Sequence, residues 1–215
     1  MPRNFVHRWK KKEPQPSIAE KIKNVTNPPG NLKQQITDVS RQIDVQVHKL
    51  DNACNRFGKR DDSLFKRVIK SLSQRDTGRA NILASELAEI RKVEKMLMHA
   101  KLALESVCMR LTTVSELGNI VVALAPAANV LRSISSEMSG IFPEANRELE
   151  NIGGVLNEIV TSTTQTSGMP VNVDAANEEA EKILEEAEKA AEERIKQQLP
   201  DVTSEGTSQR KAIKT

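Results

Sequence analysis

Between Asn31 and Val122 the sequence contains two apolar stripes of nearly equal length, separated by one short polar break. In both stripes apolar residues recur at steps of three and four, which places them on one face of a helix. The break, Ser73 to Thr77, has the length of a turn between adjacent helices. The spacing therefore predicts a long antiparallel helical hairpin, with helices over about 31–73 and 77–122. The first stripe is Leu32, Ile36, Val39, Ile43, Val47, Leu50, Cys54, Phe57, Leu64, Val68 and Leu72, and the second is Leu83, Leu87, Ile90, Val93, Leu97, Ala100, Leu104, Val107, Leu111 and Val114.

Gly58 falls inside the first stripe. A loop at this point would usually reset the helical phase, but the apolar residues continue in phase from Phe57 to Leu64 and Val68. We therefore expect one continuous helix, weakened at Gly58 by about 1 kcal/mol relative to alanine. A break at Gly58 is the main structural alternative.

The rest of the chain also favours an all-α fold. Aromatic residues make up 2% of the sequence and charged residues 28%, which suits extended helical packing better than a compact globule. Pro126 is expected to end or kink the second hairpin helix, and shorter helices are expected after it, with Asp174 capping the last. The predicted divisions are a flexible basic segment (1–30), a helical core (31–160), a polar linker (161–173), an acidic helix (174–199) and a disordered tail (200–215).

Charge is distributed unevenly along the 215 residues. Residues 1–119 carry 23 Lys and Arg against 13 Asp and Glu, a balance of +10, whereas residues 120–215 carry 9 against 16, a balance of −7. Two parts of opposite sign can attract each other or select different partners. The alternative is that they are two solvated helix faces of opposite bias.

Residues that carry common catalytic and metal chemistry do not occur in suitable patterns. His7, His48 and His99 have no Cys or His at ligand spacing, which argues against a zinc site. The sequence contains no glycine-rich phosphate loop and no serine in a nucleophile-elbow context. We expect no catalytic residues, no metal and no cofactor, and therefore no enzyme activity. Without a visible secretory segment, we expect a cytoplasmic protein.

The first twelve residues form a basic head that contains five cations, two aromatic side chains and no acid. Such a segment suits an anionic membrane surface, where each basic residue contributes about 1 kcal/mol. One subunit would bind transiently and an array would bind firmly, because linked weak contacts multiply. A solubilising tail, or one that touches RNA, is the alternative. The predicted membrane contacts are Arg3, Phe5, Arg8, Trp9, Lys10, Lys11 and Lys12.

A series of short motifs lies in order along the predicted hairpin. They are Leu64-Phe65-Lys66, Arg79-Ala80, Ala84-Ser85-Glu86-Leu87-Ala88-Glu89-Ile90-Arg91-Lys92, Leu102-Ala103-Leu104-Glu105, Arg110-Leu111 and Glu116-Leu117-Gly118. This series resembles the archaeal ESCRT-III proteins, specifically the cell division protein B (CdvB) family. The basic front, the acidic rear and the hairpin layout are shared as well, and the resemblance covers about residues 31–160.

The resemblance implies a non-enzymatic subunit that polymerises on membrane and drives constriction and scission in archaeal cell division. Its partners would be copies of itself and paralogues, an anionic membrane surface, an AAA ATPase of the division system (CdvC-like) and a membrane-recruiting division protein (CdvA-like). Members of the family switch between a closed form, with the acidic C-terminal part folded on the basic hairpin, and an open, polymerising form. The protein would be cytoplasmic and recruited to the inner face of the cell membrane at the division site.

The resemblance also implies that the ATPase grips the C-terminal tail. One docking motif of the family lies at helical spacing, and Glu192, Ile195 and Leu199 occupy some of its places, although Gln198 stands where a basic residue is expected. A second docking mode uses an extended proline-rich strand, which Leu199-Pro200 resembles. The predicted docking residues are thus Glu192, Ile195, Leu199 and Pro200, and an ordinary helix end is the alternative.

Two other functions are compatible with the sequence. A soluble coiled-coil scaffold or adaptor would use the same hairpin and never touch lipid. A nucleic-acid-associated coiled coil would place the basic front on phosphates. The second lacks a base-reading motif and a stacking series of aromatic residues, so we expect no nucleic-acid partner.

Overall fold

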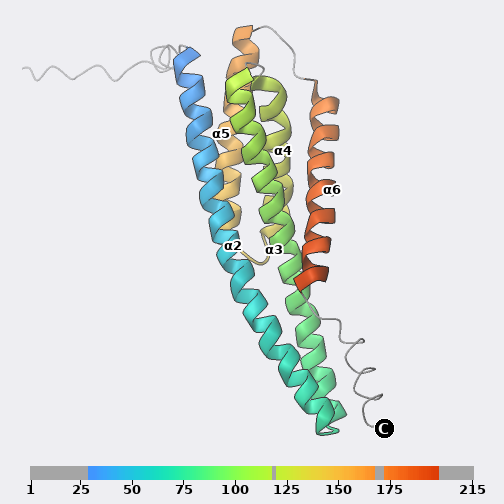
Figure 1. The fold of residues 1–215 in the computed structure, drawn as a ribbon. Helices are drawn as coiled ribbons and strands as arrows, with labels where there is room; N and C mark the ends of the chain where they lie inside the picture. The colour runs from blue at the N-terminus through green and yellow to red at the C-terminus, as the bar shows by residue number, and fades with distance from the viewer. Residues whose placement is uncertain (1–28, 118–119, 168–171, 199–215) are drawn as a thin grey trace, which may run out of the picture.

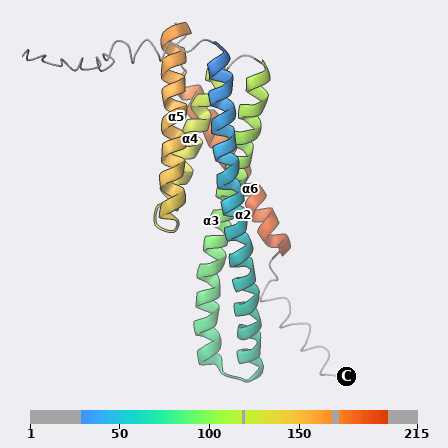
Figure 2. The ribbon, with the colours of Figure 1, turned by 90° about the vertical axis from the view of Figure 1, so that its left-hand side faces the viewer.

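The computed structural model describes residues 29–117, 120–167 and 172–198, and these residues form five α-helices. Across these ranges no strand occurs, and the predicted all-α fold is confirmed. Helices α2 and α3 form a long antiparallel hairpin, α4 and α5 pack beside its upper half, and α6 lies along α3 (Figure 1, Figure 2). The helices are α2 (Pro29–Ser73), α3 (Thr77–Leu117), α4 (Ile120–Met138), α5 (Pro143–Ser167) and α6 (Val173–Gln198).

The turn of the hairpin lies where the polar break predicts it, between Ser73 and Thr77. Arg75 adopts a left-handed conformation with φ of 58°. Asp76 is the N-cap of α3, because its Oδ1 accepts a hydrogen bond from the backbone N–H of Arg79 at 3.0 Å. These local features reverse the chain within three residues and fix the register of the two long helices.

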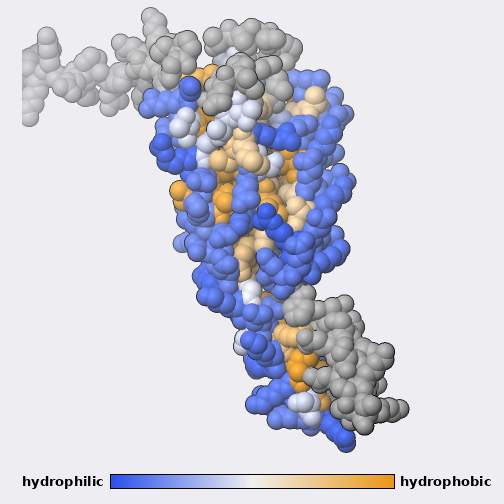
Figure 3. Space-filling model, viewed as in Figure 1, coloured by the Kyte–Doolittle hydropathy of each residue, from blue (hydrophilic) through white to orange (hydrophobic). Residues whose placement is uncertain are grey.

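The apolar residues form two separate clusters. The upper one draws on all five described helices, whereas the lower one belongs to the hairpin alone. Leu72, at the end of the first stripe, is 47% exposed and belongs to neither cluster. Figure 3 shows hydrophilic residues over most of one face, with apolar residues surfacing between the upper helices and toward the tip of the hairpin. The lower cluster is Leu64, Phe65, Val68, Leu83, Leu87 and Ile90.

The boundary between α3 and α4 differs from the prediction. The spacing predicts that the second hairpin helix ends at about residue 122, but α3 ends at Leu117 and α4 begins at Ile120. Pro126 therefore lies inside α4 instead of separating two helices. A proline in a helix interior costs about 3 kcal/mol, and here the burial of the apolar residues around it offsets that cost. The sequence signal for the true boundary is Gly118, since glycine commonly follows the last residue of a helix.

The predicted linker over 161–173 is wrong in its first half, because α5 continues to Ser167. Thr161 Oγ1 donates a hydrogen bond to the Asn157 carbonyl at 2.8 Å, and Thr164 Oγ1 donates one to the Val160 carbonyl at 2.7 Å. Hydroxyl groups that bond back to the preceding turn are satisfied within the helix. The polar composition of this segment therefore does not end α5.

The cap of the last helix also differs from the prediction. Asn172, and not Asp174, caps α6, because Asn172 Oδ1 accepts a hydrogen bond from the backbone N–H of Ala175 at 3.2 Å. Asp174 lies in the first turn, where its charge still favours the helix N-terminus. The predicted flexible segment (1–30) lies outside the described residues except at its last two positions, and the predicted tail (200–215) lies wholly outside them.

Candidate regulatory interface

Helix α6 is held against the hairpin by a face of small residues. The buried residues recur at steps of three and four, which puts them on one side of the helix. Alanine side chains allow close approach, so α6 packs against both α3 and α4. The buried residues of this face are Ala176, Ala180, Ile183, Ala187 and Ala191.

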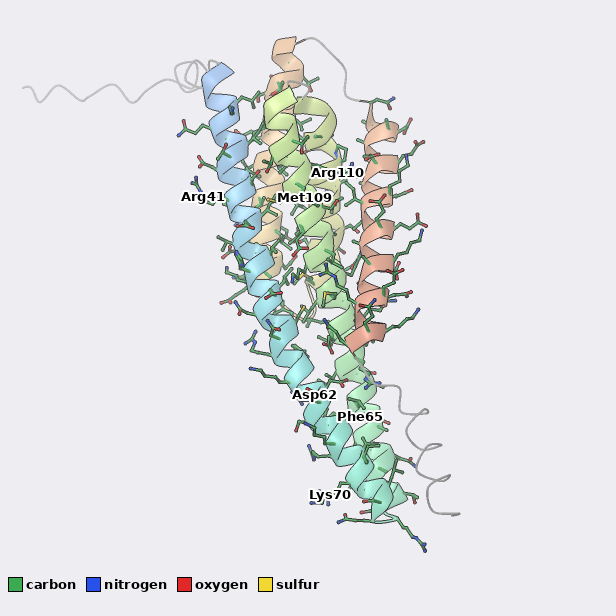
Figure 4. The ribbon with its side chains drawn as sticks, in the orientation of Figure 1. Arg41, Asp62, Phe65, Lys70, Met109 and Arg110 are labelled. Carbon is green, nitrogen blue, oxygen red and sulfur yellow. The ribbon has the colours of Figure 1, made fainter. Side chains whose placement is uncertain are left out.

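Charged residues on either side of this face form ion pairs between α6 and α3. Lys95 Nζ lies 3.3 Å from Glu188 Oε1 and 2.6 Å from Glu192 Oε1. The hydrogen bond with Glu192 raises the pKa of Lys95 above its usual value, and the same bond lowers the pKa of Glu192. Toward the other end of α6, Arg110 forms an ion pair with Glu179, and Arg110 lies on the side of α3 that faces α6 (Figure 4). Basic residues of the hairpin thus contact acidic residues of the C-terminal helix at two places.

His99 lies between these two ion-pair sites. Its Nδ1 is 3.2 Å from Glu137 Oε2 of α4, and its Nε2 is 3.2 Å from the backbone oxygen of Leu184 in α6. The side chain is 14% exposed. One residue of α3 therefore contacts both helices that pack on this side of the hairpin.

Two of the four predicted ATPase-docking residues lie in this interface. Glu192 pairs with Lys95, and the half-buried Ile195 packs against the upper apolar cluster. Leu199 and Pro200 lie outside the described residues. The side chains of Glu192 and Ile195 are therefore engaged in contacts within the chain.

The predicted membrane contacts, Arg3, Phe5, Arg8, Trp9, Lys10, Lys11 and Lys12, all lie outside the described residues. Among the helices that the structure describes, none is both long and apolar enough to cross a bilayer. In the same ranges, no cluster of three or more His, Cys, Asp or Glu side chains could hold a metal ion.

A basic hollow of about 280 Å³ lies near the tip of the hairpin. Three cationic side chains line it, and Lys70 can be followed in the lower part of the hairpin in Figure 4. No motif in the sequence predicts this hollow, because it forms only where α2 and α3 meet beside the turn. Its charge suits anions. The lining residues are Arg67, Lys70, Ser71, Gln74, Arg79 and Leu83.

The middle of the hairpin contains a buried charged group that the apolar stripes do not reveal. Asp61 is fully buried, and its Oδ2 accepts a hydrogen bond from Arg91 Nε at 2.7 Å. Glu94, one turn further along α3, is only 4% exposed. These residues lie at the junction between the upper and lower apolar clusters. A charged junction of this kind specifies how the two helices align, because a shift of register would leave a buried charge unpaired.

Neither a family model nor a solved structure matches the chain. Among curated proteins, cell division protein B1 of Sulfolobus acidocaldarius is 38% identical over 178 residues, which are 83% of this chain and 83% of that protein. The chain belongs to the cell division protein B family. Cell division protein B of the same organism is 36% identical over 172 residues, which cover 80% of this chain and 66% of that protein. Cell division protein B3 is 28% identical over 172 residues, which cover 77% of this chain and 95% of that protein.

Membership of the cell division protein B family confirms the resemblance drawn from the motifs along the hairpin, and the family is ESCRT-III-like. The match to cell division protein B1 covers 178 residues, which is longer than the hairpin, so the likeness extends beyond α2 and α3.

Proposed function

We propose that this chain is a non-enzymatic, filament-forming subunit that polymerises on membrane and drives constriction and scission in archaeal cell division. The relatives of the chain are cell division proteins. In this proposal the arrangement described above is the closed form of the subunit, in which α6 restrains the hairpin. The protein acts in the cytoplasm and is recruited to the inner face of the cell membrane.

The observation that carries the proposal is the docking of an acidic helix on a basic hairpin. Helix α6 carries nine Asp and Glu against four Lys and Arg, whereas α2 and α3 together carry 15 Lys and Arg against ten Asp and Glu. The two parts thus have net charges of −5 and +5. Opposite charges of this size attract at low salt and are screened as ionic strength rises, which makes the contact reversible.

Release of α6 would have two consequences. It would uncover the faces of α3 and α4 that α6 now covers, so that these faces become available to another copy of the chain. It would also free Glu192 and Ile195 for the AAA ATPase, together with Leu199 and Pro200 that follow them. The basic head would hold the open subunits on anionic lipid, where many weak contacts act together.

The first test reverses charge at the interface. In the full chain, Lys95→Glu combined with Arg110→Glu should repel α6 and allow assembly at lower protein concentration than wild type. Lys92→Glu combined with Arg132→Glu is the matched control, because both of these residues are exposed. Sedimentation and negative-stain microscopy, with and without anionic vesicles, measure assembly. If the interface variant and the control assemble alike at every salt concentration, restraint by α6 is wrong.

The second test concerns the membrane. Trp9→Ala combined with neutral substitutions at Lys10, Lys11 and Lys12 should weaken co-sedimentation with anionic vesicles and leave assembly in solution unchanged. Wild-type protein that assembles but never sediments with such vesicles would favour the coiled-coil scaffold. Stronger binding to duplex DNA than to anionic vesicles at the same salt concentration would favour the nucleic-acid-associated coiled coil.

The third test concerns the ATPase. In the charge-reversed background, where α6 is free, Ile195→Asp combined with Leu199→Asp should abolish binding of the ATPase. Glu193→Gln, an exposed change on the same helix, is the control. Unchanged affinity of the Ile195 and Leu199 variant would exclude this segment as the docking site.

A further inference from the structure

His99 contacts two hydrogen-bond acceptors at once. Glu137 presents a carboxylate oxygen 3.2 Å from Nδ1, and Leu184 presents a backbone carbonyl oxygen 3.2 Å from Nε2. A neutral imidazole carries one N–H and can donate to only one of these oxygens, whereas the imidazolium donates to both. The arrangement around His99 is therefore complete only when the site holds one additional proton.

Each neutral form of the ring loses one contact. With its proton on Nδ1, His99 keeps the bond to Glu137 and turns the Nε2 lone pair toward the carbonyl of Leu184. With its proton on Nε2, His99 keeps the hydrogen bond to the Leu184 carbonyl of α6 and turns the Nδ1 lone pair toward the carboxylate of Glu137. In both cases a ring nitrogen that carries a lone pair faces an acceptor oxygen. This is unfavourable because the His99 side chain is only 14% exposed, so little water can satisfy the two acceptors.

Glu137 of α4 is the acid that contacts the ring directly. Several charged residues near His99 along α3, and near Leu184 along α6, form ion pairs that do not include the ring. The pairs are Lys95 with Glu188 and Glu192, Lys101 with Asp51 of α2 and with Glu105, and Lys189 with Glu185.

We propose that His99 is a proton-dependent latch for α6. In its charged form His99 joins α3 to α4 through Glu137 and to α6 through Leu184, and loss of the proton releases one of these bonds. The closed form then binds one more proton than the released form, so a rise in pH favours release of α6. Histidine is the side chain that ordinarily changes charge near neutral pH, so the test covers pH 5.5 to 8. The consequence for assembly rests on the proposed function.

Hydrogen exchange of the full-length protein between pH 5.5 and 8 tests the latch, with rates converted to protection factors so that the intrinsic effect of pH is removed. Across this range the α6 amides of wild type should lose about ten- to a hundredfold in protection relative to those of α2, the value of one hydrogen bond from a charged donor. In His99→Gln the protection of α6 should not change with pH. In Glu137→Gln the new amide N–H can donate to neutral Nδ1 while Nε2–H keeps Leu184, so α6 should stay protected at the upper end of the range.

His48→Gln is the matched control. The side chain of His48 is 76% exposed and faces Asp44 of its own helix at 3.8 Å, so this variant should keep the pH dependence of wild type. Constant protection of wild-type α6 at all pH values would overturn the latch, as would a His99→Gln variant that changes in parallel with wild type.

Exchange reports the docking of α6 directly, whether or not filaments form. A protein that shows the latch but never assembles would refute the proposed function alone. Assembly that depends on pH while α6 protection stays constant would refute the latch alone.

Discussion

Gly58 and Glu94 face each other across the hairpin: a methyl group added at Gly58 would lie 3.3 Å from Glu94 Oε1. Glu94 is 4% exposed, and its Oε2 has no hydrogen-bond partner among the described residues. The glycine therefore provides room for a buried acid in the neighbouring helix and does not mark a break in α2, which continues through it.

Gly58→Ala should leave the free energy of unfolding within about 0.5 kcal/mol of wild type. The gain in helix propensity is up to about 1 kcal/mol, and displacement of the Glu94 carboxylate offsets it. In a Glu94→Ala background, where the carboxylate is absent, the same substitution should stabilise the protein by about 1 kcal/mol. Urea unfolding of the four proteins at pH 7 gives the coupling between the two sites. A full gain already present in the wild-type background would contradict the proposed contact.

Glu94 should make stability depend on pH. Burial, with a further contribution from Asp61, raises the pKa of Glu94 from 4.5 to about 6. The folded chain then binds more protons than the unfolded chain between these values, so the free energy of unfolding falls as pH rises through this range. The loss attributable to Glu94 should be about 2 kcal/mol.

The measurement is urea unfolding of wild type and Glu94→Gln from pH 4 to 7.5. The difference between the two proteins should change between about pH 4.5 and 6 and stay constant outside this range. Glu89→Gln, an exposed change on the same helix, should follow wild type. A difference between wild type and Glu94→Gln that does not vary with pH would show that the pKa of Glu94 is the same in the folded and the unfolded chain.

Arg91→Met should destabilise the protein by about 3 kcal/mol at pH 7, because it leaves the fully buried carboxylate of Asp61 without its cation. The loss should be smaller at pH 5, because the pKa of Glu94 is about 6 and its protonation removes a negative charge that interacts with Asp61. Arg60→Met is the control, since the pair between Arg60 and Glu86 is largely exposed and worth less than about 1 kcal/mol. Equal losses for both variants would mean that burial adds nothing to the pair in the junction.

The hairpin could be predicted because its signal is local and repeated. Steps of three and four specify one face of each helix, and the break between the stripes sets which residues lie opposite each other. This register also separates the two cysteines. Cys108 Sγ lies 3.7 Å from the Ser40 carbonyl and not beside Cys54, and both cysteines are free thiols. The boundary between α3 and α4 was harder to predict from the sequence, because burial around Pro126 outweighs the local preference of proline to end a helix.

The partners in the interface could not be predicted from the sequence. Net charge indicates that an acidic helix can bind a basic hairpin, but the rotation of α6 about its own axis decides that Glu188 and Glu192 meet Lys95. His99 carried no signal, because the partners that make it distinctive come from two other helices. The role of Gly58 likewise depends on a side chain of α3 and could not be read from its own segment.

Ile183→Ala should release α6 without unfolding the hairpin. Ile183 is 1% exposed and is the largest buried side chain on a face otherwise made of alanines. Its truncation should cost about 2–3 kcal/mol, and among the described helices α6 packs only on α3 and α4, so the loss falls on docking. Hydrogen exchange at pH 5.5 should show lost protection in α6 and unchanged protection in the lower hairpin. Ile82→Ala, at a position that is 72% exposed, should change neither. Loss of protection in both regions together would mean that α6 and the hairpin unfold as one unit, and that α6 cannot act as a separable restraint.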